Sequence, residues 1–84
     1  MNSISSVLFP HAEEDLNNLY KVLTSTKIKY NIKMIGLIIY CYKDNQLQYL
    51  ISPLTKKGNF IISKPDDETL INSESEIIRI LTCS

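Results

Sequence analysis

The sequence is poor in the residues that small proteins use for cross-links, metal sites and phosphate-binding loops. Its 84 residues include two cysteines, one histidine, two glycines and no tryptophan. Cys41 and Cys83 are too few for a disulfide framework and too far apart for the ligand spacing of a zinc site. Gly36 and Gly58 also lie far apart, which excludes a glycine-rich phosphate-binding loop. We therefore expect neither a metal ion nor another cofactor.

Long hydrophobic runs are missing as well. No stretch reaches the roughly 18 consecutive apolar residues that a membrane-spanning helix requires. The beginning of the chain has no basic region, and it meets Pro10 and three acidic residues too early for a secretory signal peptide. The sequence therefore predicts a cytoplasmic protein that does not enter a membrane.

Neither sign of charge dominates the chain. Nine basic residues balance nine acidic ones, so no overall field attracts nucleic acid or a membrane surface. A hydrophobic content of 44% and a charged content of 21% are typical of a globular protein, and the length suits one small domain over residues 1–84. Isoleucine, lysine and asparagine are abundant, as in AT-rich genes, which points to a phage, a mobile element or an AT-rich pathogen as the source.

The first structural element that the sequence predicts is an amphipathic helix. Four apolar residues fall at helical spacing and form one stripe: Leu16, Leu19, Tyr20 and Leu23. Acidic residues at positions 13–15 suit the N-terminal end of a helix dipole, and Lys21 suits its C-terminal end. The predicted helix begins near Pro10 and ends at residues 24–26, which have poorer helix propensity.

Residues 27–42 combine two different strand patterns. In the first half, lysines and asparagine alternate with apolar residues, which predicts a strand with one face in water. From Ile35 to Tyr42, odd-numbered and even-numbered positions are both apolar, so a strand here would carry apolar side chains on both faces. This part therefore needs cover on both faces, from a helix of its own chain or from another molecule. Gly36 lies at the change and indicates either a bend in one long strand or a break between two strands.

The rest of the chain predicts a hairpin, a short strand and a terminal element. Residues 43–46 form a turn before a strand at 46–52, and another turn leads into a strand at 60–63. Ser63 and Asp66 resemble a helix start, and Ser73 with Glu76 makes a stronger capping box. The predicted fold is α+β, with an N-terminal helix, a three-stranded antiparallel β-meander and a short C-terminal helix. A fourth strand is the alternative for this last element, because it is rich in β-branched residues.

We find no constellation of residues that indicates catalysis. His11 would be the base and Cys41 or Cys83 the nucleophile of a thiol mechanism, yet no local motif supports either pairing. The neighbouring acids at positions 66–68 follow a proline, a pattern more typical of a solvated helix start than of a magnesium or calcium site. The sequence therefore predicts a protein that is not an enzyme. A minimal metal-independent ribonuclease toxin, acting through lysine, tyrosine and glutamate, is one alternative.

The runner-up hypothesis, ahead of the ribonuclease, is a nucleic-acid-binding protein. Its basic residues would be the lysines of the alternating strand and of the loop that follows the hairpin: Lys27, Lys29, Lys33, Lys56 and Lys57. The predicted order of helix, three strands and helix resembles double-stranded RNA-binding domains. Those domains carry basic residues at the start of their last helix, whereas this chain has acidic residues at positions 66–68.

The leading hypothesis is a protein–protein interaction module. The doubly apolar strand and the tyrosine-rich hairpin predict a partner-binding surface formed by Ile38, Tyr40, Tyr42 and Tyr49. Tyrosine suits interfaces because it combines a large apolar body with a polar tip. The partner would be another protein, a second copy in a homodimer, or both. A regulator, an inhibitor, an antitoxin or a secretion chaperone would act in this way.

Overall fold

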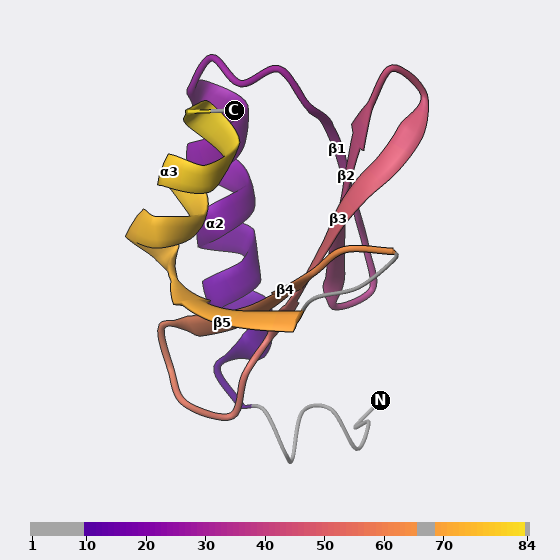
Figure 1. The fold of residues 1–84 in the computed structure, drawn as a ribbon. Helices are drawn as coiled ribbons and strands as arrows, with labels where there is room; N and C mark the ends of the chain where they lie inside the picture. Colours follow the sequence, from indigo (N-terminus) through magenta and orange to yellow (C-terminus); the bar gives the residue numbers. More distant parts are fainter. Residues whose placement is uncertain (1–9, 66–68, 84) are drawn as a thin grey trace.

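The computed structural model describes residues 10–65 and 69–83 and shows an α+β fold. Within these residues, one α-helix, five β-strands and a second α-helix follow one another (Figure 1). In chain order they are α2 (Ala12–Ser25), β1 (Asn31–Ile35), β2 (Ile38–Lys43), β3 (Gln46–Pro53), β4 (Asn59–Ser63), β5 (Thr69–Ser73) and α3 (Glu74–Thr82).

The five strands form one antiparallel sheet whose spatial order is the order of the sequence, from β1 to β5. Both helices lie on the same side of this sheet (Figure 1). Helix α2 packs against β2 and β3, and α3 packs against β4 and β5. The molecule therefore has two layers, and the helix layer covers only one face of the sheet.

The core lies between the sheet and the two helices. The apolar stripe predicted on the first helix is confirmed, because Leu16, Leu19 and Leu23 are fully buried. On the sheet, burial follows the alternation of a strand, so that Ile39 and Cys41 of β2 are buried while their neighbours are partly exposed. The remaining core residues are Tyr30, Ile51, Phe60, Ile62, Ile77 and Leu81.

A turn at Gly36 divides the doubly apolar segment into two strands. Gly36 has a φ of 59°, and Ile35 pairs directly with Ile38 across the turn. A positive φ at the first residue of a two-residue hairpin turn is typical of type II′, which glycine adopts without strain. Of the two alternatives for residues 27–42, the two-strand one is therefore correct. The predicted strand over the lysine-rich half is wrong for residues 27–30, because β1 begins only at Asn31.

The next turn forms where the sequence predicts it. Asp44 and Asn45 both have positive φ, as in a type I′ turn, and they connect β2 to β3. Asp and Asn tolerate this left-handed conformation better than most residues. The register of β2 and β3 then shifts by a bulge next to Tyr42, which pairs with Leu47.

The structure corrects the number of strands from three to five. One extra strand comes from the division at Gly36, and the other is β5. A helix start at Ser63 is wrong, because Thr69–Ser73 is extended and pairs with β4. Asp66, which that prediction also used, lies outside the described residues. With five strands the chain departs from the element order of double-stranded RNA-binding domains.

The predicted C-terminal helix is confirmed, and the alternative of a terminal strand for these residues is wrong. Helix α3 begins after Ser73, whose backbone N–H donates to Glu76 Oε1 at 3.1 Å. This bond satisfies a backbone donor next to the first turn, which has no partner within the helix. Local capping therefore outweighs the β-branched composition of the helix, while Ile77 and Leu81 anchor it to the core.

Candidate protein-interaction surface

One face of the sheet is not covered by either helix. Directly paired residues of neighbouring strands project to the same face, so the register identifies every residue on it. The buried residues of β2, β3 and β4 face the helices, and the residues between them face the other way. We call this uncovered side the open face. Its apolar residues are Ile35, Ile38, Tyr40, Tyr42, Leu47, Leu50, Ile61 and Ile71.

The apolar residues of the open face are neighbours across the strands. Ile35 lies opposite Ile38, and Tyr40 lies opposite Leu50. On the other half of the sheet, Ile61 lies opposite Ile71. Such directly opposed side chains contact each other through their apolar parts. The open face is thus an apolar surface that extends over all five strands.

Charge is almost absent from the open face. Among its positions in the five described strands, Lys33 is the only charged residue, and the polar residues are Asn31, Ser52, Asn59, Ser63, Thr69 and Ser73. Ile35 and Ile71, at the two edges, are 61% and 63% exposed. A sheet face that meets water normally carries many more polar and charged side chains. A contiguous exposed apolar surface on a small protein is typical of a binding surface.

The structure brings together three of the four residues predicted to bind a partner. Ile38, Tyr40 and Tyr42 lie on β2 and all belong to the open face. Tyr49 does not join them, because it pairs with Cys41 on the helix side of the sheet. There its ring meets that of Tyr30 edge-on, at 5.8 Å between centroids and an interplanar angle of 62°.

Sequence reasoning missed the part of the open face that comes from β3, β4 and β5. The missed residues are Leu47, Leu50, Ile61 and Ile71, together with Ile35 at the end of β1. A usable signal was present, because consecutive apolar residues also occur at 49–51, 60–62 and 70–71. Each of these short runs is apolar at successive positions and therefore supplies at least one residue to each face of the sheet.

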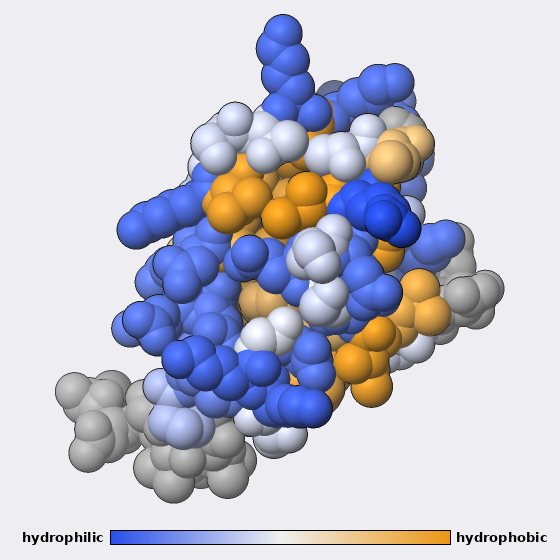
Figure 2. All heavy atoms as spheres, turned by 90° about the vertical axis from the view of Figure 1, so that its left-hand side faces the viewer, coloured by the Kyte–Doolittle hydropathy of each residue, from blue (hydrophilic) through white to orange (hydrophobic). Residues whose placement is uncertain are grey.

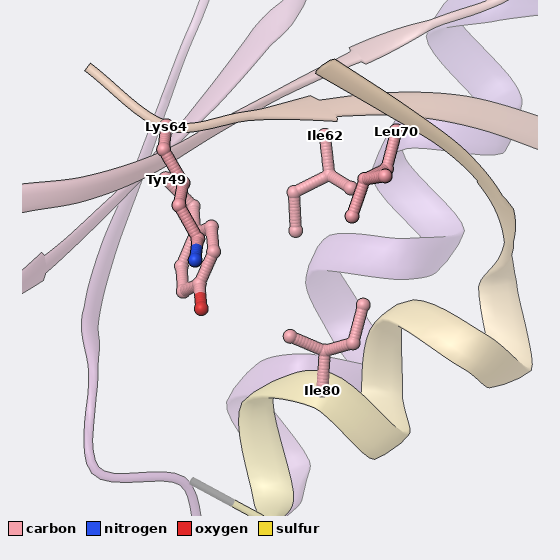
Figure 3. A pocket seen from close by; sticks show the side chains of 5 residues that line it. All are labelled: Tyr49, Ile62, Lys64, Leu70 and Ile80. Atoms are coloured by element: carbon pink, nitrogen blue, oxygen red, sulfur yellow. The ribbon is translucent and has the colours of Figure 1, made fainter. Parts of the chain in front are cut away.

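The helix side of the molecule has a different surface. Figure 2 shows hydrophilic residues over most of it, with hydrophobic ones gathered toward the top and the lower right. A hollow of about 200 Å³ on this side lies between the sheet and α3. Figure 3 shows Ile80 pointing from α3 toward Ile62 and Leu70 of the sheet. At the other end of the hollow, Lys64 Nζ lies 5.8 Å from the centroid of the Tyr49 ring.

The structure does not gather the lysines that the nucleic-acid alternative requires. All five are exposed, and Lys33 projects from β1 onto the open face. Residues 27–30 lie in the connection at the top of Figure 1, whereas residues 56–57 lie in the loop between β3 and β4 at the bottom. Lys57 Nζ also lies 3.9 Å from Glu14 Oε1, which offsets part of its charge. No specific arrangement of these residues favours phosphate binding.

His11 is held in a cluster that attaches the β3–β4 loop to the start of α2. Its Nε2 donates to the backbone carbonyl oxygen of Thr55 at 2.6 Å. Its Nδ1 lies 3.1 Å from Asp15 Oδ2 without the alignment of a hydrogen bond, and Asp15 Oδ2 accepts a bond from the Gly58 N–H at 3.0 Å. Both ring nitrogens of His11 therefore face groups of its own chain.

Neither cysteine pairs with His11. Cys41 is fully buried in the sheet beneath the helices. Cys83 is exposed after the end of α3, at the top of Figure 1, whereas His11 precedes α2 near the bottom. Within residues 10–65 and 69–83, no three histidine, cysteine or acidic side chains gather into a group that would hold a metal ion.

The two thiols are expected to react very differently. Burial raises the pKa of the Cys41 thiol from 9.0 to about 12, and the thiolate is the reactive form of cysteine. At about pH 8 the folded protein should therefore react with a disulfide reagent at Cys83 alone, and both thiols should react in denaturant. Absorbance of the released thiol measures this. A Cys83→Ser variant that still reacted rapidly when folded would contradict the burial of Cys41.

The same raised pKa predicts a loss of stability in alkali. The folded state holds the Cys41 proton more tightly than the unfolded chain does. The contribution of this thiol to the free energy of unfolding is therefore complete below pH 9.0 and falls as the pH rises toward about 12. The shift corresponds to at most about 4 kcal/mol. The comparison is with Cys41→Ala, whose midpoint of unfolding in urea should fall less steeply between pH 9.0 and about pH 12.

Among the described helices, none combines the length and the hydrophobicity needed to cross a membrane. The chain was compared with protein-family models, with curated proteins and with solved structures, and none of these comparisons gave a match.

Proposed function

We propose that this protein is a small interaction module without catalytic activity, which binds a partner protein through the open face and modulates that partner. The observation that carries the proposal is an apolar surface across the five described strands, which contribute a single charged residue to it, Lys33. A regulator, an inhibitor, an antitoxin and a secretion chaperone all act by occupying a surface of another protein.

The energetics of the open face support binding rather than hydration. Burying one isoleucine side chain that was exposed contributes roughly 1.5–3 kcal/mol. Ile35 and Ile71 are more than half exposed, and the other apolar residues of the face are partly exposed. Several such contributions together offset the loss of freedom on association.

The chemistry of the open face also indicates what the partner should present. The hydroxyl groups of Tyr40 and Tyr42 lie among aliphatic side chains, which suits a partner surface that is apolar with a few hydrogen-bonding groups. The nearly uncharged face would exclude a strongly charged surface, because charges buried there would lose their hydration without gaining a counter-ion.

Charge substitutions on the open face test the proposal. Tyr40→Asp should retain the fold and weaken binding to a purified partner at least about 100-fold, because the carboxylate would be buried without a counter-charge. The partner is first identified by co-purification with the wild-type protein from its source cell. Isothermal calorimetry or surface plasmon resonance then measures the affinity, and circular dichroism verifies the fold.

The matched control adds the same charge elsewhere. Asn18→Asp lies at an exposed position of α2, on the helix side, and should leave the affinity unchanged. Ile38→Asp and Tyr42→Asp should behave like Tyr40→Asp, because all three residues share the open face. Unchanged affinity in these three variants would show that the partner binds elsewhere on the molecule.

A further inference from the structure

The sheet has two edges, and they differ in how well they are protected. Strands β1 and β5 are the outermost strands, so each has one side without a neighbouring strand. An edge strand presents backbone N–H and C=O groups that can pair with another chain. In the part of the chain that the structure describes, the backbone hydrogen bonds formed outside the helices and strands involve none of residues 69–72.

Strand β1 carries the charges that usually prevent pairing at an edge. Exposed Lys33 lies in the strand, and exposed Lys29 lies shortly before it. Lysines at such positions oppose the approach of a second strand, because pairing would remove their hydration or bring like charges together. The sequence pattern of alternating lysines thus protects this edge.

Strand β5 carries no such charge within the strand itself. Its sequence, TLINS, contains neither a charged residue nor a proline. Leu70 and Ile71 are 45% and 63% exposed, and they project to opposite faces of the sheet. An additional strand at this edge would therefore cover apolar side chains on both faces.

We propose that β5 pairs antiparallel with β5 of a second copy of this chain, so that two five-stranded sheets join into one. The pairing has a two-fold axis at Ile71, which places Ile71 opposite itself. Leu70 then lies opposite Asn72, and Thr69 lies opposite Ser73. Within residues 69–73, no charged side chain lies opposite another in this register.

A second copy fits this edge better than a strand of unspecified sequence. Antiparallel pairing of a strand with itself is isologous and closes after two chains, as the commonest homodimers do. The chain has a formal net charge of +0, so two copies do not repel each other as whole molecules. The pairing would also bring Ile61 and Ile71 of each copy into one continuous apolar row on the open face. It uses the sheet edge and does not depend on a partner at the open face.

Two equally exposed isoleucines at opposite edges provide the first test. Ile71 on β5 and Ile35 on β1 are 63% and 61% exposed, and both belong to the open face. Ile71→Lys would place two lysines directly opposite each other, so this variant should be monomeric. Ile35→Lys should remain dimeric. Sedimentation equilibrium and light scattering at roughly 1–500 µM measure the mass, a range that includes weak dimers.

A cross-link tests the register. In a Cys83→Ser background, Ile71→Cys should form an intermolecular disulfide on mild oxidation, because directly opposed Cα atoms in an antiparallel pair are about 4.5–5.5 Å apart. Ile35→Cys in the same background should not form it. Non-reducing electrophoresis measures the dimer fraction.

The outcomes separate this proposal from the one on the open face. A wild-type protein that is monomeric over the whole range overturns the pairing of β5, and so does a dimer that survives Ile71→Lys. Tyr40→Asp should remain dimeric while it loses the partner protein. If Tyr40→Asp becomes monomeric and Ile71→Lys does not, the copies associate through the open face, and the proposed pairing of β5 is wrong.

Discussion

Replacing Ile39 by aspartate should abolish folding, whereas the same replacement at Ile38 should leave a folded protein. The two residues are neighbours in β2 and have the same side chain, but they face opposite sides of the sheet. Ile39 is fully buried between the sheet and the helices. An unpaired carboxylate there would cost several kcal/mol, a large part of the roughly 5–15 kcal/mol that stabilises a domain.

Ile38 has a different environment, although it is only partly exposed. It lies on the open face, where the described residues provide no covering element and a carboxylate keeps contact with water. We expect a loss of roughly 1 kcal/mol from reduced cross-strand contact with Ile35. Far-UV circular dichroism and thermal melting measure both variants. Equal damage by the two substitutions would mean that both faces of β2 are buried in the folded molecule.

Replacing Phe60 by alanine should have the largest effect of any change that adds no charge. Phe60 is among the largest fully buried side chains and lies in β4 opposite Pro53 of β3 and Asn72 of β5. Removing the ring of a buried phenylalanine typically costs about 3–5 kcal/mol, from lost burial and the cavity left behind. Urea unfolding should show a much lower midpoint with an unchanged slope.

The control for Phe60 is the next residue along the same strand. Ile61→Ala changes a partly exposed side chain on the open face and should cost about 1 kcal/mol or less. Partner binding should be weakened by Ile61→Ala but not by Phe60→Ala, because Ile61 contributes to the proposed surface and Phe60 does not touch it. An Ile61→Ala variant as destabilised as Phe60→Ala would show that the open face is part of a core.

These predictions depend on one feature of the sheet. Every strand after β1 has apolar residues at successive positions, so it presents apolar side chains to both faces. One parity contributes to the core and the other contributes to the open face. Stability and the proposed partner binding should therefore depend on different side chains of the same strands. A variant impaired in the proposed binding by a change on the open face should therefore retain the fold.

Local signals in the sequence were sufficient for both helices and for one turn. The stripe that includes Leu16, Leu19 and Leu23 predicts α2, because apolar residues at this spacing share one side of a helix. Ser73 and Glu76 predict the start of α3 through hydrogen bonds within a single turn. Asp44 and Asn45 predict the turn of the central hairpin. Each of these depends on residues within a few positions of one another, which is why the sequence sufficed.

The number of strands and the identity of the open face were decided by contacts between distant residues. Leu37 is an unusual turn residue, so the sequence at Gly36 is compatible with a bend in one strand and with a turn between two strands. The pairing of β1 with β2 decides for the turn. Strand β5 is a short uncharged segment that is extended because β4 lies beside it. Alternation along a strand says that neighbouring side chains face opposite ways, but not which side the helices will cover. The packing of α2 and α3 on the sheet decides which side is covered. It buries Ile39 and Cys41, which lies opposite Tyr49, and leaves Ile38 uncovered.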